Sequence, residues 1–127
     1  MPKSIPSELK KCIADHRLWL ESHGEQGHRA VLNGFDLSDL DLQGVKLEDA
    51  LLRGADLSGI QLRAADLTGA DLTDCCLENA GLQWANLAGA NMAMCNTTGA
   101  RFYQCDFSGS KLVQVDLPTA NHDNNSA

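Results

Sequence analysis

Apolar residues recur at every fifth position through most of the chain. The 18 positions from 32 to 117 that lie five apart hold 14 Leu, two Phe, one Met and one Thr. The positions two residues earlier are apolar except for Ser110, and most of them are small residues such as Ala or Cys. The residue between the two sets is mostly Asp or Asn, and the last two places of each five are polar and often end in Gly.

A period of five cannot describe the buried face of one helix, because a step of five residues turns a side chain by about 140°. Within each five, the order small, polar, large has the period of two that extended backbone requires. The two remaining residues have turn chemistry, since Gly accepts a positive φ without steric penalty. Each five therefore predicts a three-residue strand and a corner. Identical units predict a solenoid with the large side chains inside and small residues where the interior is narrow.

The sequence ADLTGADLTD, from Ala65 to Asp74, resembles the pentapeptide-repeat family, whose consensus is A-(D/N)-L-x-x. The resemblance covers residues 30–121. It implies an all-β solenoid of one kind, a right-handed quadrilateral parallel β-helix. Four fives then make one coil, so the repeat region predicts about four and a half coils.

The ends of the solenoid need covers, since bare ends expose core and unpaired backbone. Residues 1–29 are expected to provide one, with a capping helix over 7–23 for which Ser7 is the expected N-cap and Gly24 the expected stop. We expect Trp19 to belong to the core. The face that packs on the first coil is predicted to hold Leu9, Cys12, Ile13, His16, Trp19 and Leu20.

No comparable helix follows the repeats, and residues 122–127 are polar and expected to be disordered. The last coil could therefore be poorly covered. The resemblance to the family raises a homodimer through this C-terminal end as one hypothesis, and a monomer as the other.

The charge and composition narrow the function classes. Ten Lys and Arg against 17 Asp and Glu give a net charge of −7, which argues against direct binding of nucleic acid. No apolar run is long enough to span a membrane, and the first residues contain no apolar signal core. Five Cys, an odd number, fit a reducing compartment better than a disulfide scaffold. We expect a cytoplasmic protein.

The residues give little support for catalysis, a cofactor or a metal site. The four His lie outside the repeats, at positions 16, 23, 28 and 122. Cys75 and Cys95 hold the same place one coil apart and are expected to stack as small core residues, whereas Cys76 should point outward. Ser110 has no His nearby in the repeat pattern. The sequence predicts a protein that is not an enzyme.

One side of the expected β-helix is acidic. The fives centred on residues 37, 57, 77, 97 and 117 present five acids and no base: Asp36, Asp39, Asp56, Glu78 and Asp116. We call these five residues the acidic side. Some members of the family that the chain resembles imitate the charge of DNA and bind DNA gyrase or topoisomerase IV, so the acidic side is one candidate surface for a type II topoisomerase.

A second candidate surface is an aromatic patch formed by Trp84, Arg101 and Tyr103, with Arg63 one coil below. Exposed Trp, Tyr and Arg are typical of interface hot spots, although an aromatic packed locally over a corner fits equally well. Our first hypothesis is a non-enzymatic interaction or scaffold module that binds a partner protein. The alternative is a DNA-mimicking topoisomerase modulator, and the third possibility is a stacking structural element.

Overall fold

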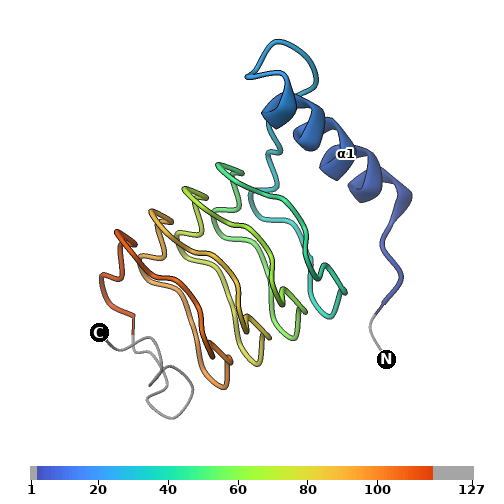
Figure 1. The fold of residues 1–127 in the computed structure, drawn as a ribbon. Helices are drawn as coiled ribbons and strands as arrows, with labels where there is room; N and C mark the ends of the chain where they lie inside the picture. Colours follow the sequence, from blue (N-terminus) through green and yellow to red (C-terminus); the bar gives the residue numbers. More distant parts are fainter. Residues whose placement is uncertain (1–2, 116–127) are drawn as a thin grey trace.

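The computed structural model describes residues 3–115 of the 127-residue chain. Its helix, α1, runs over Ser7–Glu21 and lies across one end of a stack of coils (Figure 1). The coils follow one another away from α1 toward the C-terminal end of the described chain (Figure 1). The described part of the chain contains no helix with the length and apolar character that a bilayer-spanning segment needs.

Each coil pairs with the next at a fixed offset of four fives. Parallel bridges join Val31 to Leu51 at the start and Asn91 to Lys111 at the end, and those between them keep the same offset. Each bridge stands alone, so one residue of each five pairs in this way and the predicted three-residue strands are not continuous. The offset agrees with the coil expected from the repeat. The total of about four and a half coils stays a prediction, because it includes residues beyond the described range.

Each corner ends in a residue with positive φ. The angle is 69° at Gly54 and 61° at Trp84, and Asp39, Asp49 and Ala64 adopt nearly the same conformation without being glycine. L-residues with a side chain accept this region at a cost, which explains why Gly is frequent at the position. The prediction that the last two places of each five form turns is confirmed.

The interior is filled as the periodicity predicts, with one clear difference. The central residues from Leu32 to Phe102 are buried, and most of the small positions between them are buried too. Phe35, which occupies a small inward position in the pattern, is 50% exposed. The narrow interior accepts Ala at these places, so an aromatic ring in the first coil is placed outside. The pattern predicts an inward place for residue 35, and this prediction is wrong for Phe35.

His16 joins α1 to the first coil through both ring nitrogens. The side chain is fully buried; Nε2 lies 2.8 Å from the carbonyl oxygen of Glu48, and Nδ1 accepts the backbone N–H of Ala30 at 2.8 Å. This pair of bonds requires the neutral tautomer with the proton on Nε2. Leu9 is also buried, and the remaining residues of the expected face are half-buried, Trp19 among them.

Both ends of α1 differ slightly from the bounds and the cap that the sequence predicts. Ser7 is the first helical residue rather than the cap, and Pro6 precedes it without a side-chain hydrogen bond. At the other end, the N–H of Gly24 donates to the carbonyl oxygen of Trp19 at 2.8 Å, and that of His23 donates to Leu20 at 3.3 Å. These two bonds form a Schellman ending. The helix thus stops at Glu21, shortly before the expected end.

Candidate partner-binding site

Three side chains meet at one corner of the solenoid. The backbone N–H of Trp84 donates to the carbonyl oxygen of Tyr103 at 2.8 Å, so these two corner residues lie in adjacent coils. The indole and phenol rings have centroids 5.3 Å apart and meet edge to face at 83°. On the other flank, the guanidinium carbon of Arg63 lies 4.5 Å from the centroid of the Trp84 ring. We call Arg63, Trp84 and Tyr103 the aromatic corner.

The aromatic corner is fixed and yet accessible. Trp84 is 48% exposed and Tyr103 is 43% exposed, although each ring has a partner on the neighbouring coil. A cation over an indole face and an edge-to-face aromatic pair each stabilise the geometry by about 0.5–1.5 kcal/mol. These two contacts hold the ring of Trp84 in one position.

The structure changes which arginine belongs with the aromatic residues. Arg101 is exposed and pairs in register with Gly81, but among residues 3–115 it makes no ion pair and no ring contact. Arg63 makes the contact with Trp84 instead. In the coil-to-coil register, the residue 20 positions before Trp84 is Ala64, and Arg63 comes immediately before Ala64. The register therefore predicts that Arg63 lies near Trp84 but does not predict a direct contact.

The acidic side contains a base that the sequence did not reveal. Lys3 pairs with Leu40 in a parallel bridge, and its Nζ donates to the hydroxyl of Ser38 at 3.3 Å, close enough to Asp36 to act on its charge. The expectation of a surface without a base is therefore wrong. The N-terminal segment lies outside the repeats, so their periodicity carries no information about where Lys3 falls.

Asp36 and Asp56 close the turns of their own corners. Oδ1 of Asp36 accepts the backbone N–H of Ser38 at 3.0 Å and its hydroxyl at 2.6 Å, and Asp56 makes the same two bonds with Ser58. The hydroxyl and then the N–H of Ser38 lower the pKa of Asp36. The Asp or Asn at this place of the repeat is thus explained by turn chemistry. The same backbone bond is made by Asp41, Asp66, Asp71, Asn86, Asn91, Asn96 and Asp106.

The other members of the acidic side have different surroundings. Oδ1 of Asp39 lies directly over Gly59 of the next coil, so closely that a Cβ at Gly59 would force the Asp39 side chain to move. Glu78 is exposed, and its carbonyl oxygen accepts the N–H of Gly59 at 2.8 Å. Asp116 lies outside the described residues. The register confirms that Asp36 and Asp56 stack directly, one coil apart.

The family model for pentapeptide repeats, with 8 copies, matches residues 28–59, 46–81 and 80–117. The chain belongs to the pentapeptide-repeat family. The match covers the region in which the period of five was found, and the family's fold is a right-handed β-helix solenoid. The family indicates a structural repeat and no catalytic class.

Solved structures of pentapeptide-repeat proteins are similar to this chain. One is the protein alr5209 from Nostoc PCC 7120, with 28% identity over 95% of this chain and 96% of that chain, at a TM-score of 0.48. Another is Rfr23 from Cyanothece 51142, with 30% identity over 65% and 60% of the two chains, at a TM-score of 0.36.

A third is QnrB1, a plasmid-mediated fluoroquinolone resistance protein, with 22% identity over 71% of this chain and 48% of that chain, at a TM-score of 0.34. None of these three likenesses is strong enough to transfer a role. A comparison with curated proteins gives no significant match.

Three of the five thiols of this pentapeptide-repeat protein are core groups, whereas Cys12 and Cys76 are half-buried. Cys75, Cys95 and Cys105 are buried, and each donates to the carbonyl oxygen of the residue 23 positions earlier at 2.8–2.9 Å. The adjacent Cys95 thiol and burial raise the pKa of Cys75, and burial raises the pKa of Cys105 to about 12. Ser110 makes the same bond with its hydroxyl, at 2.6 Å. Residues 3–115 contain no group of three side chains suited to hold a metal ion.

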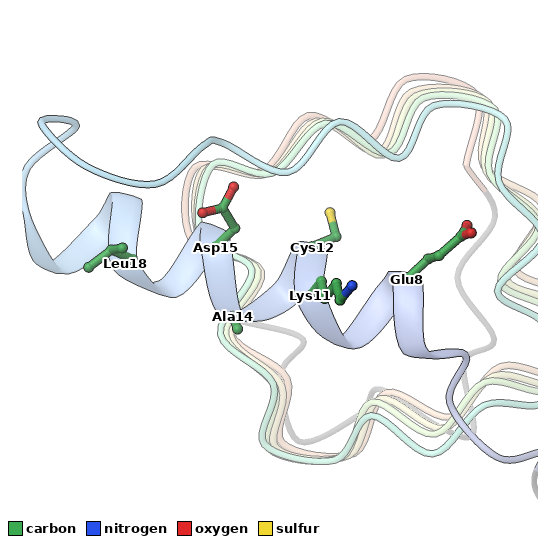
Figure 2. Close-up of a pocket in the computed structure, with 6 residues that line it drawn as sticks. All are labelled: Glu8, Lys11, Cys12, Ala14, Asp15 and Leu18. Carbon is green, nitrogen blue, oxygen red and sulfur yellow. The ribbon is translucent and has the colours of Figure 1, made fainter.

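A shallow pocket of about 580 Å³ lies along one flank of α1 (Figure 2). Glu8, Cys12 and Asp15 point to the same side of the helix there (Figure 2). Burial, and then the charge of Asp15, raise the pKa of Cys12, so this thiol is a weak nucleophile. The repeat pattern contains no sign of this pocket, and its remaining lining residues are Lys11, Ala14 and Leu18.

Proposed function

We propose that this pentapeptide-repeat protein is a non-enzymatic interaction module that binds a partner protein through the aromatic corner. The observation that carries the proposal is the position of Trp84, whose ring is held between Arg63 and Tyr103 and yet is 48% exposed. Local packing explains how the ring is fixed, but it leaves half of a large apolar surface in water. Residues of this kind dominate the binding energy of protein interfaces.

The backbone supports the same conclusion. Trp84 has a φ of 61°, in a corner place that holds Gly at eight of the 17 corners between residues 34 and 114 and another residue at nine. A side chain at this place costs roughly 1 kcal/mol relative to Gly, so the fold alone would favour Gly. A strained position that carries a half-exposed aromatic ring points to a functional reason for that ring.

The test is site-specific photocrosslinking with benzoylphenylalanine in place of Tyr103 and, as a matched control, in place of Val113. Val113 is 64% exposed in the same coil, at the opposite corner of the repeat. We expect an adduct from Tyr103 and none from Val113, and Trp84→Gly should abolish it. Gly suits the backbone at this corner, so that variant removes the ring without adding strain. Equal adducts from both positions would contradict the proposal.

The alternative, a DNA-mimicking modulator of a type II topoisomerase through the acidic side, has one observation in its favour. Asp36 and Asp56 stack in register, and the lowered pKa of Asp36 keeps it charged. Asp36→Asn with Asp56→Asn tests it well, since Asn makes the same turn bond at position 86. Inhibition of gyrase supercoiling that disappears in this double variant would favour the alternative, and no inhibition by the wild type would refute it.

We also propose that α1 acts as the cover of the first coil and that the chain works in the cytoplasm. The two bonds of His16 and the burial of Leu9 support the first proposal. The five cysteines are all free thiols, which fits a reducing compartment.

A further inference from the structure

Gly81 is a glycine that the backbone does not require. It holds the polar, outward place of its five, one residue before the inward Leu82, and its φ is outside the positive range that the corner glycines adopt. A Cβ at this position would meet Oε1 of Gln61 at 2.7 Å and Oε1 of Gln83 at 3.1 Å, both at the ends of flexible side chains. Neither local geometry nor a rigid neighbour therefore explains why a side chain is missing here.

Gly81 lies beside the aromatic corner and is itself buried, because side chains of neighbouring positions occupy the space that its own side chain would take. Gly81 stacks between Gln61 and Arg101 in the bridge register, and the carboxamides of Gln61 and Gln83 fold over it. The nitrogen of Gln61 donates to the carbonyl oxygen of Gly59 at 3.3 Å. Gln83 makes no hydrogen bond through its side chain within residues 3–115, so its donors and acceptor are available to a ligand.

The charge of this surface differs from that of the whole chain. Arg63 and Arg101 face outward on it against the single acid Asp41, whereas the chain carries a net charge of −7. Arg63 presents one face to the Trp84 ring, and a guanidinium stacked in this way keeps the N–H groups along its edge for a carboxylate. The surface is suited to a short anionic ligand. A long polyanion would also meet the acidic residues on the neighbouring sides and be repelled.

We infer that the surface formed by Gln83, Arg101 and the aromatic corner binds an acidic peptide segment of a partner protein in extended form. Carboxylates of the peptide pair with Arg63 and Arg101, its main chain bonds to Gln83, and an apolar side chain packs on Trp84. The inference rests on the proposed function, since it names the partner chemistry of the same site. An extended chain suits this surface because Arg63 and Arg101 belong to coils two apart on the same side, a span of about 10 Å at the usual strand spacing.

The experiment is a selection of displayed random dodecapeptides against the full chain, followed by synthesis of the selected peptides and titration of each against purified variants. We expect peptides rich in Asp and Glu that contain one or two apolar residues. Arg63→Gln and Arg101→Gln should each weaken binding about tenfold, since each removes a charge-assisted bond. Gly81→Gln should weaken binding about tenfold, because the new side chain displaces the carboxamide of Gln83 from its place beside the aromatic corner. Lys111→Gln, which removes a charge from the opposite side, should leave affinity unchanged.

The outcomes separate the inference from the proposal beneath it. Peptides that need Trp84 but carry no excess of acid, or that bind equally after both arginine changes, would overturn the inference and leave the aromatic corner as a binding site. A single-stranded oligonucleotide that binds more tightly than any selected peptide would also overturn it. If no selected peptide depends on Trp84, the inference fails, and the crosslinking experiment decides the proposed function separately.

Discussion

The contact between Asp39 and Gly59 offers a sharp test of how the corners stack. Both Gly59 and Gly54 have positive φ, at 67° and 69°, so Ala at either place meets the same backbone penalty. The surroundings differ. A Cβ at Gly54 would have nothing within 4 Å, whereas a Cβ at Gly59 would come far inside contact distance of Asp39 Oδ1. Gly54→Ala is therefore the matched control for Gly59→Ala.

The magnitudes follow from this difference. Gly54→Ala should lower the free energy of unfolding by about 1 kcal/mol, the net of left-handed strain and a stiffer unfolded chain. Gly59→Ala should lower it by about 2 kcal/mol, because the Asp39 side chain must also leave its rotamer. In the background Asp39→Ala, the cost of Gly59→Ala should fall back to about 1 kcal/mol, which gives a coupling energy of about 1 kcal/mol.

The assay is urea unfolding followed by circular dichroism, with the midpoint and the slope fitted for all five proteins. At a typical slope of 1–3 kcal/mol/M, the extra penalty moves the midpoint by roughly 0.3–1 M. Equal midpoints for Gly54→Ala and Gly59→Ala would refute the reasoning, as would an unchanged penalty in the Asp39→Ala background. Either result would mean that Asp39 moves away freely and has no role in stacking, which would return it to the candidates for partner binding.

Three further changes test other parts of the structure. His16→Phe should lower the free energy of unfolding by about 2–4 kcal/mol in the same assay, because it leaves the Ala30 N–H and the Glu48 carbonyl without a partner; a loss under 1 kcal/mol would contradict the buried pair. Ala64→Gly should raise the free energy by about 0.5–1 kcal/mol, since the φ of 59° suits Gly, and a decrease would show that strain is absent there. The pKa of Asp36 is lowered in the fold, so its stabilising effect is present above the unfolded pKa of about 3.9 and is lost as pH falls below it; Asp36→Asn should flatten the fall of the thermal midpoint between pH 5 and 2, and an unchanged profile would contradict it.

The repeat itself could be predicted because a fixed period carries its own register. A chain with large apolar residues at every fifth position can bury all of them inside a solenoid. The bridges agree with this arrangement, because each one joins residues four fives apart. The period does not predict the position of a side chain that is too large for the space inside the solenoid. Phe35 obeys the pattern but has a ring too large for a small interior position, and it lies outside.

The contacts that fell outside the prediction lie across the register or beyond the repeats. Arg63 reaches Trp84 diagonally, and a long side chain makes such a contact although the column of stacked residues at that corner does not contain it. Lys3 reaches the acidic side from a segment that has no period at all. His16 was placed on the correct face of the helix, but its two backbone partners come from the start and end of the first coil, which only the closed fold brings together.

The fold offers a way to rank the two candidate surfaces. Asp36 and Asp56 each close a turn, and Asp39 packs over Gly59, so three of the five acids on that side have a role in the fold itself. For Trp84 and Gly81, the fold does not provide a comparable reason. At Trp84 the positive φ favours Gly, whereas at Gly81 φ lies outside the range that favours Gly, so the backbone conformation explains neither choice. Residues that the fold does not require are the ones whose identity a binding partner would explain, and they lie next to one another on one side of the solenoid.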